Sequence, residues 1–339
     1  MKPYCADDYY ARFSELRMKT TPHVDCLIPG HKKMDCALVG TGVIEASGFG
    51  EPEGEKIKPK EAHLTPDVNF SMGVAGKGGP GNGTSFHSHP ETEVFAIFQG
   101  QFQVMSGLER REFNHITLKR FDLIAVPKFS FRSFMELDEE NFLFAMMAAQ
   151  HPKKVTWVPN IIRHARGRGL VLLEDSTLID TTKGYTVPKG AKEKEPLSEE
   201  EAAKFKILTA EQLEEATFRH EKAKWHEFAY GLQCAYVLGH ENTTPKFHLN
   251  DDCGVNIFLF KLHNRNKIKL KNSHRAILIL FAGEINITLH LEDGPHTIWV
   301  REGDTLYIPD NCHYELSLIT KEAQYYLYVS DNNSKITAD

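Results

Sequence analysis

The chain has 339 residues, with 40 Lys and Arg against 46 Asp and Glu, so its formal net charge is −6 at pH 7. Its length and its 41% of hydrophobic residues predict a globular protein of two domains, each large enough for its own core. A mildly acidic chain without a dense stripe of Lys and Arg is a poor binder of nucleic acid. No apolar run approaches the ~20 residues that span a bilayer, and the first residues contain no apolar stretch typical of a secretory signal. We therefore expect a cytoplasmic protein that binds neither nucleic acid nor membranes.

The beginning of the chain is its least regular part. We expect one helix near residues 8–18 and, around it, an arm (1–66) that packs on one of the domains that follow. Short apolar runs come next, separated by Gly, Pro or charged turns, and predict a β-rich domain over residues 67–188. These runs are EVFAIF (93–98), FDLIAVP (121–127) and FLFAMMA (142–148).

Residues 189–225 are charged and helix-prone, and Ser198 and Glu201 have the spacing of a helix-capping box. We interpret this stretch as a linker with one or two surface helices. A second β-rich domain is predicted over residues 226–339, where short runs rich in Val, Ile, Phe and Tyr return. They are CGVNIFLFKL (253–262), AILILFAGEINITLHL (276–291), HTIWV (296–300), DTLYIP (304–309) and YYLYVS (325–330).

The two β-rich domains share a local plan. Each contains an apolar strand that ends in Gly and is followed at once by a new strand, AIFQGQFQV at 96–104 and LILFAGEINI at 278–287. Two copies of one strand–turn–strand plan favour a duplicated domain, with a single large sandwich as the alternative.

Two histidines and a glutamate stand close together in the first β-rich domain. On a strand, residues two apart face the same side, so His87 and His89 present both imidazoles together. If the chain turns back at Pro90, the strand that begins at Glu93 can bring its carboxylate to the pair. Two neutral imidazoles and one carboxylate form a facial triad that leaves coordination positions open on a metal ion. The alternative is that these histidines are ordinary core or surface residues.

This spacing resembles the first motif of the cupin superfamily, G-x5-H-x-H-x3-E-x6-G. All five fixed positions match, at Gly81, His87, His89, Glu93 and Gly100. The resemblance implies an all-β fold of two double-stranded β-helix (cupin) barrels joined by the charged, partly helical linker. It also implies a divalent metal held by His87, His89 and Glu93 in the first barrel.

The second cupin motif, G-x5-P-x-G-x2-H-x3-N, is matched less well. Pro127 fits, but Arg132 replaces the histidine that is usually the fourth ligand in the family, and Glu136 replaces the asparagine. Arginine stays protonated and has no lone pair to give, so it cannot be a ligand. Two interpretations remain open. Arg132 could point into the barrel as a catalytic and substrate-binding residue that pairs with an anionic oxygen, or it could face solvent or form an ion pair with Glu136 or another acid.

The second β-rich domain resembles a cupin barrel that has lost its ligands. Aligning its strand-ending glycine with that of the first domain places Leu270, Asn272 and Ala276 where the three ligands stand. His313 alone cannot hold a metal. We therefore expect a degenerate barrel without metal, with a second ligand pocket as the alternative.

The triad suits Fe(II) best, with Mn, Ni, Co or Zn as alternatives. Aromatic residues crowd the motif strands, and we expect Phe95 and Phe134, with Arg132, to bind a flat organic substrate. The resemblance extends to quercetin dioxygenases and diketone-cleaving dioxygenases. It implies a non-haem iron dioxygenase that uses dioxygen to cleave or oxidise a phenolic, enolic or diketone substrate.

Two other classes of function fit the same resemblance. One is a non-redox isomerase, cyclase or decarboxylase that uses the metal as a Lewis acid. The other is a ligand-binding or storage bicupin. The resemblance is also compatible with a homodimer formed by exchange of terminal arms.

Overall fold

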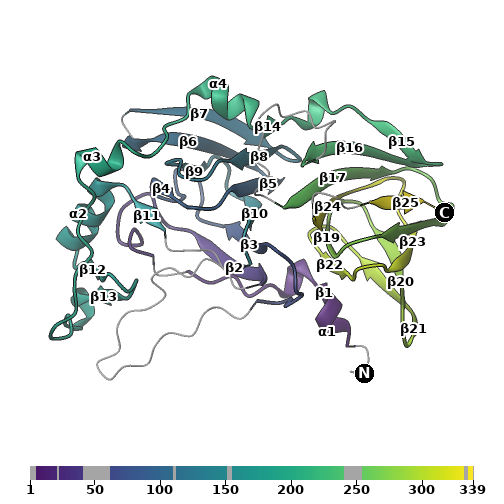
Figure 1. The fold of residues 1–339 in the computed structure, drawn as a ribbon, viewed down its shortest axis with the longest axis horizontal. Helices are drawn as coiled ribbons and strands as arrows, with labels where there is room; N and C mark the ends of the chain where they lie inside the picture. The colour runs from purple at the N-terminus through teal and green to yellow at the C-terminus, as the bar shows by residue number, and fades with distance from the viewer. Residues whose placement is uncertain are drawn as a thin grey trace.

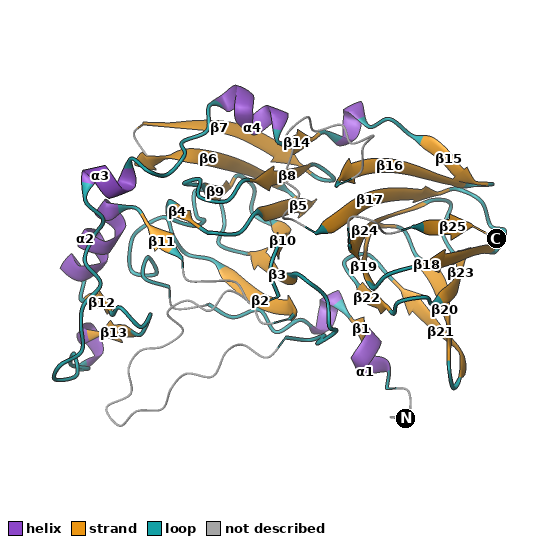
Figure 2. Cartoon of the chain, in the orientation of Figure 1, coloured by secondary structure: helices purple, strands orange, loops and turns teal. Residues whose placement is uncertain are grey.

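The computed structural model describes residues 5–20, 23–40, 62–109, 112–150, 155–239, 254–331 and 335–338. Within these ranges the protein consists mainly of strands, which form two β-rich halves side by side (Figure 1). The helices are few and short, and α2, α3 and α4 lie on the outside of the first half (Figure 2). No helix in the described part of the chain is long and apolar enough to cross a membrane.

The first half contains a six-stranded sheet in the order β14-β8-β5-β10-β3-β2 and a three-stranded sheet in the order β7-β6-β9. Their strands are β2 (Met34–Val39), β3 (Ser71–Gly76), β5 (Glu93–Gln99), β6 (Gln101–Glu109), β7 (Glu112–Lys119), β8 (Leu123–Val126), β9 (Ser133–Glu136), β10 (Phe142–Met147) and β14 (Thr217–Phe218). Two small antiparallel pairs accompany them, β4 (His87–Ser88) with β11 (Thr156–Trp157) and β12 (Leu170–Leu172) with β13 (Leu178–Asp180).

The second half contains a seven-stranded sheet in the order β1-β22-β19-β24-β17-β16-β15 and a five-stranded sheet in the order β21-β20-β23-β18-β25. Their strands are β1 (Tyr10–Ala11), β15 (His226–Ala229), β16 (Leu232–Leu238), β17 (Val255–Leu262), β18 (Ile268–Asn272), β19 (Ala276–Ala282), β20 (Ile285–Leu291), β21 (Gly294–Val300), β22 (Thr305–Ile308), β23 (His313–Leu318), β24 (Ala323–Ser330) and β25 (Ile336–Ala338).

The helices are α1 (Ala6–Tyr9), α2 (Pro159–Gly167), α3 (Glu199–Ala202) and α4 (Ala210–Glu215). The predicted capping box is confirmed at the start of α3, where Ser198 and Glu201 each bond the other's backbone. A second box, Thr209 with Gln212, begins α4. Beyond α4 the chain returns to the first half, because β14 pairs with β8.

The large sheets of the two halves pack against each other, which explains why their central strands are continuous apolar runs. On β5, Phe95 and Ile97 face the inside of the first half, while the neighbouring Phe98 belongs to a core shared with the second half. Phe281 of β19 lies in that shared core, with its ring centroid 5.4 Å from that of Phe98 and 5.7 Å from that of Phe144. A strand covered on both faces loses the alternation of apolar and polar residues.

The prediction of one helix near residues 8–18 is wrong. The structure has a four-residue helix, then β1, which pairs with β22, and then a single 3-10 turn at Phe13–Glu15. The ring of Phe13 lies between the halves, with its centroid 5.1 Å from that of Phe98 and 5.0 Å from that of Phe142. Tertiary pairing and burial outweigh the local helix propensity of this stretch. The arm therefore contacts both halves, since β2 joins the sheet of the first half.

The shared strand–turn–strand plan has a steric reason. Gly100 between β5 and β6 has φ of +72°, and Gly283 between β19 and β20 has φ of +79°. A Cβ atom would lie 2.2 Å from Asn141 Oδ1 at the first position and 2.2 Å from the Glu322 carbonyl oxygen at the second. Only glycine satisfies both the left-handed backbone and the close approach.

We predict that Gly100→Ala destabilises the protein more than Gly79→Ala. Gly79 also has a left-handed φ, +82°, but a Cβ atom added there would meet no other atom within 4 Å. Alanine at Gly79 meets only the left-handed backbone cost of ~1–2 kcal/mol, whereas Gly100→Ala adds an overpacking cost of ~1–3 kcal/mol. Urea unfolding of the two variants measures the difference. Equal losses would show that the contact with Asn141 is not what requires glycine.

Candidate metal centre

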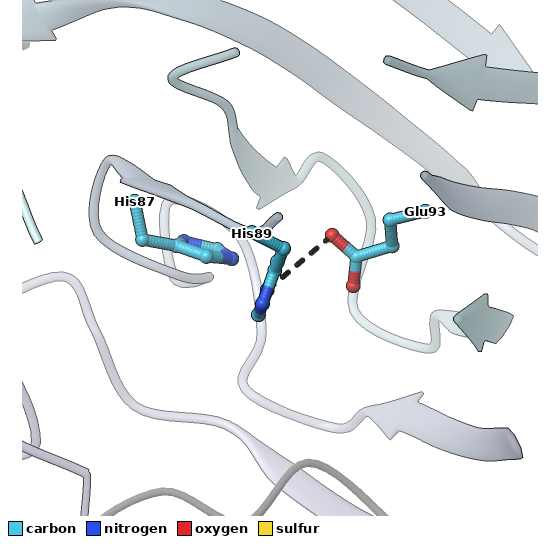
Figure 3. Close-up of side chains that lie close together, drawn as sticks. All are labelled: His87, His89 and Glu93. Atoms are coloured by element: carbon cyan, nitrogen blue, oxygen red, sulfur yellow. Dashed lines mark ion pairs between the residues drawn. The ribbon is translucent and has the colours of Figure 1, made fainter. Parts of the chain in front are cut away.

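The three predicted ligands come from two neighbouring segments of the first half. His87 lies on β4, His89 follows that strand directly, and Glu93 is the first residue of β5. Their side chains converge, as Figure 3 shows, and one ligand atom from each lies within 4.8 Å of the other two. All three side chains are buried. In the described ranges this is the one group of three or more His, Cys, Asp or Glu that could hold a metal ion.

The backbone around His87 is held from both sides. Its N–H donates to the Arg132 carbonyl at 3.0 Å, and the Arg132 N–H donates back to the His87 carbonyl at 2.9 Å. On the other side β4 pairs with β11, where Trp157 stands opposite His87 with the ring centroids 5.4 Å apart. The backbone position from which the His87 imidazole projects is therefore held by strand pairing on both sides.

The ring of His87 has a defined tautomer. Its Nδ1 lies 2.7 Å from the Ser85 carbonyl oxygen, which can only accept a hydrogen bond, so Nδ1 carries the proton and Nε2 keeps its lone pair. Burial, helped by the nearby charge of Arg132, lowers the pKa of His87 to about 3. The ring is thus neutral at physiological pH, as a metal ligand must be.

His89 is also neutral, because burial and the charge of Arg132 lower its pKa well below the ordinary value. Its Nε2 lies 3.7 Å from Glu93 Oε2, and its buried Nδ1 has no hydrogen-bond partner among the residues that the structure describes. A buried imidazole nitrogen without a partner is energetically costly. This unsatisfied atom, in a donor set of two imidazoles and a carboxylate, fits a divalent metal ion.

Arg132 lies beside the predicted carboxylate ligand and not in solvent. Its side chain is fully buried, and its Nε donates to Glu93 Oε2 at 3.0 Å. Its other nitrogens donate to the carbonyls of Ser130 at 2.9 Å and Glu91 at 3.4 Å. Of the two interpretations left open, the structure shows an ion pair with an acid, and that acid is Glu93. Glu136 instead accepts the backbone N–H groups of a glycine loop. The predicted contact of Arg132 with a substrate stays a prediction.

The Arg132–Glu93 pair decides the charge of the carboxylate. Burial raises the pKa of Glu93, and the adjacent guanidinium opposes that rise. Burial lowers the pKa of Arg132, which the charge of Glu93 opposes in turn. Because each charge compensates the other, an ionised carboxylate can exist inside the barrel.

Phe95 and Phe134 belong to the interior core of the first half, and Phe95 stands two residues after Glu93 on β5. Their ring centroids lie 5.7 Å apart in an edge-to-face arrangement, and Phe134 makes a similar contact with Phe102 at 5.8 Å. These contacts belong to the hydrophobic core between the two sheets. A role of either ring in binding substrate stays a prediction.

No family model matches the sequence, and no curated protein matches it. By structure the chain is similar to a variant of Bacillus subtilis oxalate decarboxylase, at 12% sequence identity and a TM-score of 0.58, over 97% of this chain and 79% of that one. A second structure of that enzyme, from work on its Mn(II) centres, aligns over the same shares of the two chains at 12% identity and a TM-score of 0.56. The fold is a bicupin. This confirms the predicted all-β fold of two cupin barrels, and at 12% identity it says nothing of the activity of this chain.

The second barrel of this bicupin has a different interior. At the three positions aligned with the ligands, Leu270 and Ala276 offer no donor atom, and the side-chain oxygen of Asn272 accepts a hydrogen bond from Tyr314 at 3.0 Å. His313 is exposed. In place of the triad, the barrel is filled by a large hydrophobic cluster.

The sequence did not reveal what supports the centre from the N-terminal arm. Asp25, His31 and Lys33 are buried next to the segment that precedes β4, and they contact Ser85 directly or through one another. The one signal available was two charged residues and a histidine within a short irregular segment. Such a pattern is more often a solvated loop than part of a site.

We predict that Arg132→Leu destabilises the protein by about 3–5 kcal/mol, because it leaves the buried Glu93 carboxylate without its partner. Adding Glu93→Gln to that variant recovers part of the loss, since the double variant buries no unpaired charge. Urea unfolding in the presence of a chelator measures both. Lys119→Leu, which breaks the exposed pair with Glu221, is the control and leaves stability nearly unchanged. A double variant less stable than Arg132→Leu alone would contradict this account of the pair.

Proposed function

We propose that this bicupin is a metal-dependent enzyme with its active site in the first barrel. His87, His89 and Glu93 would hold one divalent ion, and a small anionic organic substrate would complete the coordination. The observation that carries the proposal is the convergence of three buried donors, one of them with an unsatisfied nitrogen. A barrel that served only for storage would gain nothing from burying two imidazoles and a carboxylate together.

The reaction we favour is a non-redox one, decarboxylation of a small carboxylic acid. It is supported by the structural similarity to oxalate decarboxylases, whose solved structures include work on Mn(II) centres. When bound, the metal would act as a Lewis acid on a carboxylate or carbonyl oxygen. In this chain Arg132 keeps Glu93 ionised and oriented, and the Ser85 carbonyl keeps Nε2 of His87 free of a proton. Burial of His89 and Glu93 would limit the access of water to the centre.

The second candidate is the iron-dependent dioxygenase that the sequence favours. It is supported by the donor set itself, because two histidines and one carboxylate with open positions are typical of non-haem Fe(II) oxygenases. In that case dioxygen would be a co-substrate, and a phenolic, enolic or diketone substrate would lie against the aromatic wall.

Metal content tests the proposal. We predict that protein purified without added metal contains about one divalent ion per chain by elemental analysis. His89→Ala loses most of it, since only two ligands remain. His115→Ala, which removes an exposed histidine on β7, is the control and keeps the full content. Equal metal content in the wild type and His89→Ala would refute a metal centre at this place.

Gas exchange distinguishes the two reactions. We predict that the manganese-loaded protein releases CO2 from a member of a panel of small mono- and dicarboxylic acids without net oxygen uptake. Glu93→Gln is expected to reduce that rate by at least about tenfold. If the iron-loaded protein consumes oxygen with phenols or diketones instead, the dioxygenase is correct. If the metal-replete protein neither releases CO2 nor consumes oxygen with any of these substrates, both reactions are excluded.

A further inference from the structure

A segment of the N-terminal arm buries three polar side chains behind the metal centre. Asp25, His31 and Lys33 are 0%, 5% and 6% exposed, although they belong to an irregular stretch that precedes the first long strand. Charged side chains are almost never buried to this degree unless they are paired. Each must therefore be accounted for by its contacts.

These contacts meet at Ser85, two residues before His87. The Ser85 N–H donates to Asp25 Oδ2 at 2.9 Å, and its hydroxyl lies 3.1 Å from His31 Nδ1. Its carbonyl accepts the hydrogen bond from His87 Nδ1 at 2.7 Å. All three polar groups of Ser85 are thus engaged, two by the arm and one by the predicted ligand.

The charge of Asp25 is balanced within the same cluster. Lys33 Nζ lies 3.4 Å from Oδ1 and 3.5 Å from Oδ2. Burial would raise the pKa of Asp25, but Lys33, the nearby histidines and the Ser85 N–H together lower it to about 2. Asp25 therefore accepts the Ser85 hydrogen bond as a carboxylate, and a charge-assisted bond of this kind is stronger than a neutral one.

A serine, a histidine and an aspartate in contact suggest a hydrolytic triad, and the geometry excludes it. The Ser85 hydroxyl and Asp25 Oδ2 approach the same nitrogen of His31, Nδ1, at 3.1 and 3.8 Å. In a triad the serine and the acid bind opposite nitrogens of the ring, so that a proton can pass between them. The cluster thus supports the backbone and supplies no nucleophile.

We propose that Asp25 and His31 are positioning residues of the metal centre. By clamping Ser85 they hold its carbonyl against His87 Nδ1, which fixes the tautomer and the orientation of that ligand. The N-terminal arm then contributes to the metal centre, in addition to packing on the barrel. This inference rests on the proposed metal centre. Hydrogen-bond partners of metal-binding histidines contribute about 10–100-fold to metal affinity in other proteins.

Matched double variants test the clamp. Asp25→Ala with Lys33→Met removes the acceptor for the Ser85 N–H and leaves no unpaired charge. Asp25→Asn with Lys33→Met also removes both charges but keeps an acceptor oxygen. The control, Asp122→Ala with Arg219→Met, deletes another ion pair of the same barrel, between a buried aspartate and a partly exposed arginine, and Glu214 keeps its contact with Lys222. Asp122 directly precedes β8, at the end of that strand away from the partner of Glu93. Affinity for Mn²⁺ is measured by competition with a chelator, and coordination by the visible absorption of the Co²⁺-substituted protein.

We expect the alanine-containing variant to bind Mn²⁺ at least about tenfold more weakly and to change the Co²⁺ spectrum. The asparagine variant and the control are expected to stay within about threefold of the wild type. Unchanged affinity in the alanine variant, or an equal loss in the control, overturns the clamp while leaving the metal centre in place. If the wild type binds no Mn²⁺, or if His89→Ala binds it equally well, the proposed function itself is overturned.

If the alanine variant does not fold, Ser85→Ala gives the same test from the other contact. It removes the hydroxyl that meets His31 and leaves the backbone bonds of residue 85 in place. We expect it to weaken Mn²⁺ binding by about threefold or more, as the loss of one hydrogen bond would. Affinity equal to that of the wild type would count against the clamp.

Discussion

The ion pair between Arg132 and Glu93 is the interaction on which the first barrel depends. An ionised carboxylate inside a closed apolar barrel needs a partner, and the guanidinium provides one at 3.0 Å. The backbone of the same arginine also exchanges two hydrogen bonds with the backbone of His87. One residue therefore holds two of the three predicted ligands in place. Arg132 stands where many cupins place a histidine ligand. In this chain that position holds the remaining ligands in place and gives no lone pair of its own.

The position of the site follows from how the two halves meet. The large sheets pack face to face, so residues on both faces of β5 and β19 are buried. Phe98 of the first half and Phe281 of the second belong to the hydrophobic core that the two sheets share. The ligands lie at the start of β5 and on or next to β4, which pairs with β11, and Asp25 of the N-terminal arm accepts a hydrogen bond from Ser85 close by. Both halves share a strand plan, and in the first half the buried pair of Asp25 and Lys33 is bonded to the segment that carries His87.

Several features could be predicted from the sequence because they depend on neighbours along the chain. The alternation of His87 and His89 and the return of the chain to Glu93 involve only seven consecutive residues. The glycines at 100 and 283 mark the same steric demand in both halves. The partner of Arg132 was left open because it lies 39 residues away, and the support of Ser85 by Asp25 joins residues 60 apart. The prediction of an N-terminal helix was wrong for a related reason. Tyr10 pairs with β22 and its hydroxyl donates a hydrogen bond to Asp304, and local helix propensity does not take such distant contacts into account.

The charges at the centre also bear on what it can bind. His87 and His89 are neutral, and Glu93 and Arg132 cancel each other, so these four side chains together carry no net charge. A cupin with a fourth histidine in place of the arginine would present a net negative charge from its carboxylate. Replacing that histidine by arginine thus adds one positive charge beside any divalent ion held there. A buried excess of positive charge is costly unless anions enter with the metal. This is a physical argument for the anionic substrate that we propose, and it follows from Arg132, which stands in place of the histidine of the cupin motif.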